Sequence, residues 1–212
     1  MKKIIIIFAS FFASTIHAAT PIDGWYASAF GGYSYFEGNV STRVGGLFFN
    51  LPKYRDGWNA GGRWGYQSNP MRYELEYTYT QGDTYKFSIG PTPQTGVTGT
   101  TSASFGMLNV YYDFPDVVPA IAPFIGAGIG YGYVTAELNS TGPIGVARFK
   151  RTDNVFSYQG TVGGTYNFAE NYAVNLAYRY VGSDSAGAFG QRYQVQMATI
   201  GVIYRFEGNQ YK

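Results

Sequence analysis

The chain has 212 residues, of which 19% are aromatic and 13% charged, with 29 glycines and no cysteine. This length suits one all-β domain, and the lack of an apolar run of 18 or more residues beyond the N-terminus excludes transmembrane helices. Of the 15 basic residues, two are Lys2 and Lys3 in a leader, and the remaining 13 balance 13 acidic residues. The charge therefore gives no argument for binding nucleic acid.

The first residues have the composition of a secretory signal peptide. Lys2 and Lys3 precede an apolar stretch from Ile4 to about Ala13, and small residues follow. We predict a signal peptide over residues 1–18, with cleavage after Ala19 as the alternative to cleavage after Ala18. A short buried helix is the other interpretation of this segment. The domain that follows is predicted to cover residues 19–212.

Eight segments after the leader alternate between apolar and polar residues. They predict strands at residues 24–38, 57–67, 70–81, 102–114, 122–137, 154–168, 172–181 and 191–206. In each segment one parity is apolar, with small or aliphatic residues in the middle and aromatic residues at the ends. This sorting is typical of a strand that crosses a bilayer with its rings at the two water interfaces. The prediction is an all-β fold, an eight-stranded antiparallel up-and-down transmembrane β-barrel.

The outward parity then forms two aromatic girdles. Their predicted members are Trp25, Tyr33, Tyr35, Trp58, Trp64, Tyr66, Tyr73, Tyr77, Tyr79, Tyr112, Tyr131, Tyr133, Tyr158, Tyr166, Tyr172, Tyr178, Tyr204 and Phe206. The competing fold is a soluble eight-stranded binding barrel such as a lipocalin, which would place the same apolar parity inside.

The second and third strands are predicted to form a hairpin with its turn at Ser68–Asn69. That turn places Trp64 opposite Tyr73 and Arg63 opposite Glu74. The apolar face and the charge pairing then follow from one register.

Four segments rich in turn-forming residues are predicted as long loops at one end of the barrel: 38–56, 82–100, 138–153 and 182–191. The first of them holds an apolar patch of Leu47, Phe48, Phe49 and Leu51. Two interpretations of this patch stand: a loop that packs on its neighbours or covers the barrel mouth, and a contact surface for a host molecule or another partner.

Glycine recurs at every second position from Gly126 to Gly132, on the inward parity of its strand. No helix and no Lys-Ser/Thr pair follows, so a nucleotide-binding loop is not supported. We expect the bare wall to leave room for large side chains opposite, such as Phe30.

Charged residues of inward parity are predicted to pair inside the narrow lumen, because buried charges need partners. The predicted structural ion pairs join two glutamates to inward arginines, with gating or an ion path as the alternative role. The residues are Arg63, Arg72, Glu74, Glu76, Arg179 and Arg205.

The sequence offers few residues that could carry out catalysis. The single histidine, His17, lies in the leader and there is no cysteine, so a Ser–His pair, a thiolate nucleophile and the usual nitrogen or sulfur metal ligands are missing. Glu74 and Glu76 share a face and are the residual candidates for carboxylate chemistry. We predict no enzyme activity, no catalytic or metal site and no cofactor.

Several short motifs, in their order, resemble small eight-stranded outer-membrane barrels of Gram-negative bacteria, typified by the OmpA transmembrane domain, opacity-type surface antigens and porin-family relatives. They are Gly24-Trp25-Tyr26, Gly65-Tyr66-Gln67-Ser68-Asn69-Pro70, Asn109-Val-Tyr-Tyr-Asp-Phe114, Pro123-Phe-Ile-Gly-Ala-Gly-Ile-Gly130, Tyr178-Arg-Tyr180 and Gly201-Val-Ile-Tyr-Arg-Phe206. The resemblance implies an outer-membrane location and contact with lipid and lipopolysaccharide. It also implies insertion by the barrel-assembly machinery through the C-terminal strand, and contact of the loops with the environment or host surface molecules.

The chain departs from these relatives in continuing past Phe206 to Lys212, which moves the terminal aromatic signal inward. We also expect the barrel to be the entire mature protein, without a peptidoglycan-binding domain. A structural surface barrel is therefore the predicted function. The alternatives are a small passive channel and, with the least support, a lipid-modifying enzyme.

Overall fold

A computed structural model describes residues 23–36, 42–44, 47–54, 57–89, 92–93, 98–115, 121–140, 147–185 and 192–206. The predicted signal peptide and the tail after Phe206 lie outside these residues. Among the described residues no helix is long and apolar enough to span a membrane.

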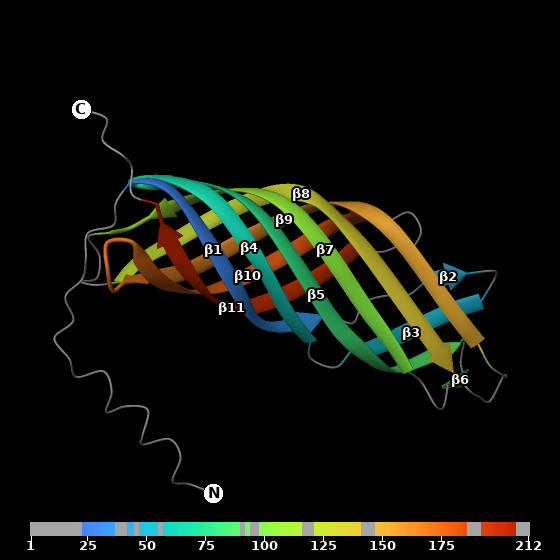
Figure 1. The fold of residues 1–212 in the computed structure, drawn as a ribbon. Coiled ribbons are helices and arrows are strands. Elements are labelled where there is room, and N and C mark those ends of the chain that lie inside the picture. The colour runs from blue at the N-terminus through green and yellow to red at the C-terminus, as the bar shows by residue number, and fades with distance from the viewer. Residues whose placement is uncertain are drawn as a thin grey trace, which may run out of the picture.

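Eight of the described strands close into an antiparallel barrel (Figure 1). They are β1 (Gly24–Phe36), β4 (Gly57–Ser68), β5 (Met71–Ile89), β7 (Thr98–Asp113), β8 (Ile121–Ser140), β9 (Ala147–Asn167), β10 (Tyr172–Ser185) and β11 (Arg192–Arg205). Each pairs with the next along the chain, and β1 pairs with β11 to close the wall. The predicted eight-stranded up-and-down barrel is confirmed.

The wall sorts its side chains as the parity predicts. Leu75, Leu108 and Leu176 on the outer surface are 59%, 63% and 65% exposed, whereas Arg179 and Glu76 inside are 0% and 1% exposed. Apolar side chains outside and charged ones inside are the arrangement of a barrel solvated by lipid. The alternative of a soluble barrel with its apolar parity inside is therefore wrong.

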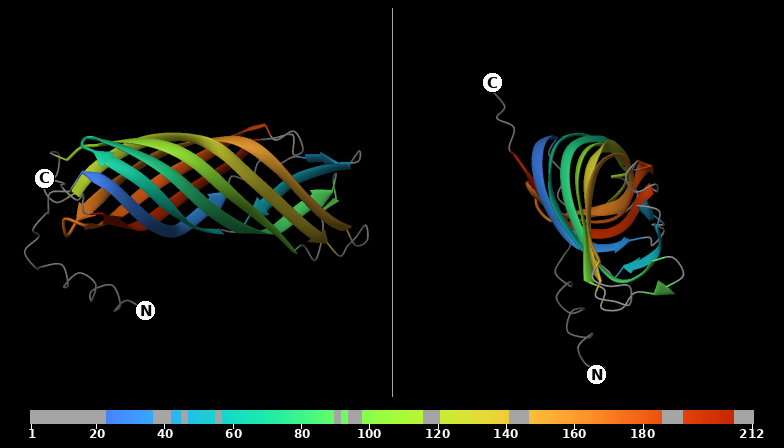
Figure 2. Two further views of the ribbon diagram at one scale, coloured as in Figure 1. Left: turned by 45° about the horizontal axis from the view of Figure 1, so that its top comes forward. Right: turned by 90° about the vertical axis from the view of Figure 1, so that its right-hand side faces the viewer.

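The two ends of the barrel differ. One end, here the turn end, carries the turn between β4 and β5 and the bend at residues 168–171 between β9 and β10. The other, the loop end, carries the four longer connections and the short strands β2 (Thr42–Val44), β3 (Leu47–Tyr54) and β6 (Thr92–Pro93) (Figure 2).

Five of the described barrel strands, β5, β7, β8, β9 and β10, run further at the loop end than the sequence predicts, so the predicted loops that they border are shorter. Residues 38–56 include β2 and β3, and β3 pairs with β5 from Phe49↔Ile89 to Tyr54↔Thr84. The β8–β9 ladder continues to Ser140↔Ala147. Backbone pairing does not require lipid, so a ladder can continue into water wherever its outward side chains become polar.

The predicted register of the first hairpin is wrong by two residues. Arg63 pairs with Glu76 rather than Glu74, and Trp64 pairs with Leu75 rather than Tyr73. The turn lies at Asn69–Pro70, one residue later than predicted. Proline has no N–H to give to a ladder, which favours its place in the turn over the start of a strand. A shift of two residues keeps every side chain on its predicted face.

The glycine row on β8 faces different side chains from those expected. Tyr111, Asn109, Met107 and Phe105 of the neighbouring β7 lie against Gly126, Gly128, Gly130 and Gly132 respectively, each beside its own ladder partner. The expected Phe30 instead lies against Gly61 and Gly201. The bare wall thus gives room to the adjacent strand rather than to one across the lumen.

Candidate functional site

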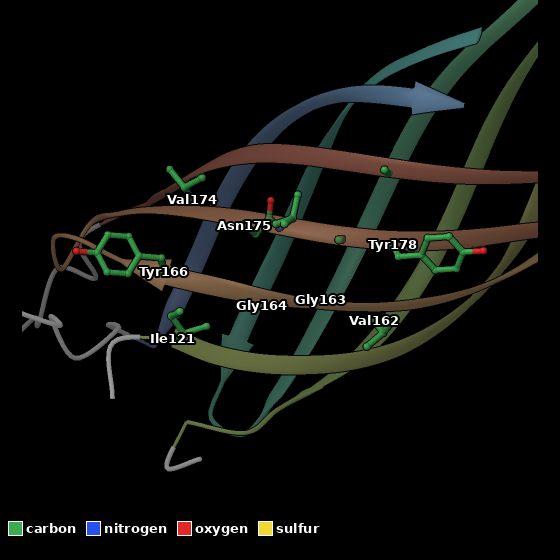
Figure 3. A pocket seen from close by; sticks show the side chains of 11 residues that line it. Ile121, Val162, Gly163, Gly164, Tyr166, Val174, Asn175 and Tyr178 are labelled. Atoms are coloured by element: carbon green, nitrogen blue, oxygen red, sulfur yellow. The ribbon is translucent and has the colours of Figure 1, made fainter. Parts of the chain in front are cut away.

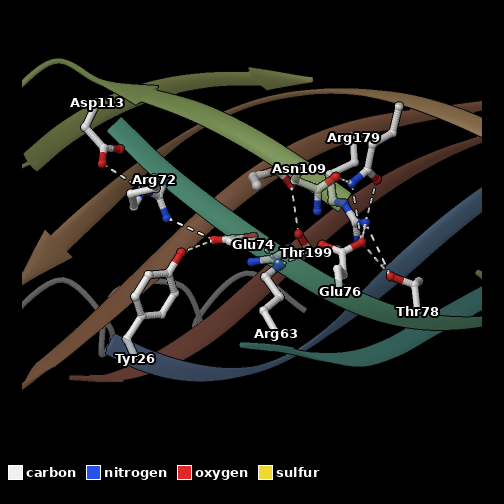
Figure 4. Close-up of polar contacts among 12 residues, drawn as sticks. Tyr26, Arg63, Arg72, Glu74, Glu76, Thr78, Asn109, Asp113, Arg179 and Thr199 are labelled. Atoms are coloured by element: carbon white, nitrogen blue, oxygen red, sulfur yellow. Dashed lines mark hydrogen bonds and ion pairs between the residues drawn. The ribbon is translucent and has the colours of Figure 1, made fainter. Parts of the chain in front are cut away.

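The centre of the lumen is organised around Glu76, which projects from β5. Its Oε2 accepts a hydrogen bond of 2.7 Å from Nε of Arg63 on β4, and its Oε1 is paired with Nη2 of Arg179 on β10. Thr78 donates a further hydrogen bond of 2.8 Å to Oε1. Figure 4 shows these contacts converging on one carboxylate from different parts of the wall.

A second group of charges lies towards the turn end. Nε of Arg72 is 2.7 Å from Oδ2 of Asp113, and its Nη1 is 3.3 Å from Oε1 of Glu74. The hydroxyl of Tyr26 donates to the same Glu74 oxygen over 2.5 Å. Arg63 links the two groups, because its Nε is 3.5 Å from Oε2 of Glu74.

Arg205 differs from the other three arginines. Its Nε donates to Gln67 over 3.2 Å, and its Nη2 donates to Asn167 over 2.8 Å. The sequence predicts that Arg205 pairs with a glutamate, but in the described part of the chain it makes no ion pair with Glu74 or Glu76. Arg205 is only 3% exposed, so neutral amide oxygens hold a buried guanidinium at the turn end.

Aromatic rings cover the arginines from the side. Phe30 lies 4.1 Å from the guanidinium carbon of Arg63 and 5.0 Å from that of Arg179, measured to the ring centroid. The corresponding distances from Arg72 to Tyr111 and Phe124 are 4.9 and 4.8 Å. Contacts of this kind stabilise a cation that has left water.

Sequence reasoning missed several members of this network. Asp113 and Tyr26 were not assigned, and neither was Gln159, which accepts from Arg179 over 2.7 Å and donates to Asn109. The available signal was parity, since Asp113 shares its inward face with Asn109 on β7. The ionic half of the lumen is hereafter the set Arg63, Arg72, Glu74, Glu76, Asp113, Arg179 and Arg205.

The lumen changes character towards the loop end. A cluster of buried apolar side chains fills it there, with the ring of Tyr193 packed against it. We call this cluster the apolar half: Phe36, Ala103, Phe105, Met107, Val134, Val155, Val181, Val195 and Met197. The two halves together leave the interior occupied by side chains, as expected for eight strands.

The predicted girdle residues all lie on the outer parity. Fifteen of the 18 are among the exposed large side chains, and Tyr79, Tyr166 and Phe206 are half-buried. At the turn end their rings touch one another: Trp25 and Tyr66 lie 5.3 Å apart between centroids, and Tyr204 and Phe206 lie 5.2 Å apart.

The predicted contact patch falls in β3. The backbone of Leu47, Phe48, Phe49 and Leu51 forms strand there, whereas their side chains lie outside the described part of the structure. Among the described residues no group of three or more His, Cys, Asp or Glu side chains could hold a metal ion.

The sequence matches the family described as outer membrane protein beta-barrel domain over residues 4–206. An outer membrane protein of Gluconacetobacter diazotrophicus is 32% identical over 198 residues, which cover 80% of this chain and 51% of that protein. The chain spans about half the length of the curated relatives it matches.

Two solved structures share the fold. Neisserial surface protein A gives a TM-score of 0.52 at 17% identity, with 86% of this chain and 97% of that one covered. Ail, the attachment invasion locus protein of Yersinia pestis, gives 0.50 at 16% identity, with 87% and 100% covered. At such identities the likeness concerns the fold alone. Because the family match extends over nearly all of the sequence, this chain belongs to the outer membrane protein beta-barrel domain family and is a transmembrane barrel of the Gram-negative outer membrane.

Proposed function

We propose that the protein is a surface barrel whose loop end binds molecules outside the cell, host surface molecules among them, and that it is neither an enzyme nor an open pore. The observation that carries this proposal is that β8 and β9 continue beyond the girdle residues Tyr131 and Tyr133, as far as Ser140 and Ala147 at the loop end. In outer-membrane barrels the longer connections face outward from the cell, so this sheet is placed in the surrounding medium.

The boundary between lipid and water can be read along β8 and β9. Outward residues on β8 change from Tyr131 and Tyr133 to Thr135 and Glu137, and Thr135 lies across from Thr152 at 3.1 Å between hydroxyl oxygens. Glu137 pairs with Lys150, whose side chain is 69% exposed. From Tyr133 the strand continues to Ser140, about 23 Å at about 3.3 Å per residue.

A projecting sheet with polar outward side chains suits partner binding better than membrane anchoring. The names of two proteins with this fold, a neisserial surface protein and an attachment invasion locus protein, are consistent with such a role. The Leu47–Leu51 patch in β3 belongs to the same end of the molecule and is proposed as part of the contact surface.

The filled lumen argues against the alternative of a passive channel. An ion crossing the barrel would have to pass the charge-paired ionic half and then the packed apolar half, beside which the buried polar groups of Ser34, Asn59 and Thr80 are bonded to one another. We expect planar-bilayer recordings to show no steady large current. The paired Glu74 and Glu76 are likewise assigned to structure rather than to catalysis.

Two partners follow from the outer-membrane location. The girdled outer surface is proposed to contact lipid and lipopolysaccharide, and the last strand, β11, is proposed to carry the signal for the barrel-assembly machinery. Its outward residues Ile200, Val202 and Tyr204 lead to Phe206, so every second position at the end of the wall carries an apolar or aromatic outward side chain.

The test is removal of the projecting tip without disturbing the barrel. Replacing Leu138–Phe149 by Asn-Gly joins the ladder partners Glu137 and Lys150 through a two-residue turn that favours a hairpin. Cells that display this variant should lose most binding to cultured host cells or to matrix-coated plates. A second variant lacking Gly46–Leu51 tests the β3 patch separately.

Folding is checked by heat-modifiable gel migration, in which a folded barrel runs differently from a boiled one. The matched control is Leu108→Ile, an exchange on the lipid-facing wall far from the tip. If both shortened variants fold and bind as the parent does, while the parent binds above a barrel-free strain, the loop end is not the binding surface.

A further inference from the structure

The outer wall is not uniformly convex: an apolar groove of about 600 Å³ lies across β8, β9, β10 and β11 (Figure 3). Eleven residues line it, and the side chains on its rims are Ile121, Val162, Tyr166, Val174, Leu176 and Tyr178. Its volume is that of a small-molecule site, within the range of about 300–1,000 Å³.

Gly164 is the reason for the groove. It occupies an outward position on β9, with Leu176 of β10 and Pro123 of β8 as its ladder partners. Leu176 is 65% exposed and stands beside the gap that Gly164 leaves between Val162 and Tyr166. Ala198 of β11, the ladder partner of Tyr178, is a second small outward residue in the lining.

The groove reaches the turn-end interface. Ile121 is the first residue of β8, and Tyr166 and Val174 form a ladder pair close to the bend between β9 and β10. Beyond them the exposed rings of Phe168 and Tyr172 stack at 6.3 Å between centroids. Aromatic rings mark the level of lipid headgroups, so the groove extends from that level into the hydrocarbon layer.

We propose that this groove holds one acyl chain of a phospholipid from the periplasmic leaflet, bound in a fixed position rather than exchanging freely with bulk lipid. Short turns face the periplasm in this class of barrel, which assigns the leaflet. A second copy of the barrel fits less well, because a stable protein interface uses about 20–30 residues a side and the groove offers eleven.

The experiment is lipid counting on barrels extracted in mild detergent, by native mass spectrometry with identification of the retained lipid. The test variant is Gly164→Leu, which fills the groove; the nearest atom to its added Cβ is the Cγ2 methyl of Ile121 at 3.2 Å, and no backbone atom of a neighbouring strand lies within 4 Å. The control is Gly106→Leu, at another outward glycine, on β7, where an added Cβ meets nothing within 4 Å.

The parent and Gly106→Leu should each retain one phospholipid. Retention by Gly164→Leu should fall about tenfold, the equivalent of roughly ten lost van der Waals contacts between the acyl chain and the groove. Ala198→Phe narrows the groove from the β11 side. It replaces Gly164→Leu as the test variant if Gly164→Leu does not show the folded band on gels.

Equal retention by the groove variants and the control overturns the proposal. Retained lipopolysaccharide in place of phospholipid overturns the leaflet assignment. A parent that migrates as a dimer, which Gly164→Leu converts to a monomer, assigns the groove to a second copy instead.

Discussion

The two halves of the lumen are built on the same strands and the same inward parity, yet they exclude water by different means. On β7 the change comes between Met107 and Asn109, and on β10 between Val181 and Arg179. One side of this boundary is held by ion pairs and hydrogen bonds of fixed geometry. The other side is held mainly by packing, which depends on volume and little on direction, with one small group of hydrogen bonds among Ser34, Asn59 and Thr80 beside it.

This difference teaches how the two halves should respond to substitution. A buried charge that loses its partner keeps the cost of desolvation without the compensating attraction, so the ionic half should not tolerate conservative exchanges. An apolar cluster tolerates exchanges that conserve volume. Substitutions of similar size on either side of the boundary therefore test the comparison.

The largest effect is expected from Glu76→Gln, because this carboxylate holds Arg63 and Arg179 together. Removing one partner of a buried pair costs about 3–5 kcal/mol of unfolding free energy. Urea titration of the barrel in detergent, followed by tryptophan fluorescence, measures the loss. Replacing Glu76 and Arg179 together by Met should recover part of it, although Arg63 still loses its 2.7 Å partner. An unchanged stability of Glu76→Gln would show that Glu76 acts by shape alone.

A truncation in the apolar half comes next. Met197 is fully buried, and Met→Ala in a packed core costs about 2–5 kcal/mol, depending on how far the surroundings collapse. The same urea titration, applied to Met197→Ala, measures this loss of unfolding free energy. An unchanged midpoint would mean that the apolar half contributes no packing energy.

A smaller loss is expected for Arg205→Gln. Arg205 bonds only amide oxygens among its described contacts, so its removal leaves buried acceptors rather than an unpaired charge, at about 1–3 kcal/mol. The informative quantity is the difference from Glu76→Gln under the same conditions. Equal losses would contradict the distinct environment assigned to Arg205.

The smallest effect belongs to Met107→Leu, a volume-conserving exchange in the apolar half. Met107 is 1% exposed and packs beside Gly130, and such exchanges usually cost less than about 1.5 kcal/mol. Arg63→Lys is the matched conservative change across the boundary, since lysine cannot reproduce the fork of a guanidinium. The comparison fails if Met107→Leu proves the more damaging of the two.

Much of the wall could be predicted from parity. Leu75, Tyr77 and Trp64 face outward and Arg63 and Glu76 face inward as the alternation requires, because successive side chains of a strand point to opposite faces. Parity alone did not predict which residues of neighbouring strands are paired. The hairpin register moved by two residues because Pro70 is in the turn, and neither the apolar pattern nor the charge pattern detects an even shift.

The sequence by itself determined the class of the protein. A strand with lipid on one side and a crowded lumen on the other needs apolar and polar residues at alternating positions, and this alternation is visible within each short segment of sequence. Tertiary structure decided what no local pattern contains. It pairs Glu76 with Arg179, which is distant in sequence, and it places amide oxygens around Arg205. It also places side chains of β7, rather than of β1, against the glycine row, and it separates the inward residues into an ionic and an apolar half. These depend on which residues a closed, staggered wall brings to the same level, and closure is a property of all eight strands together.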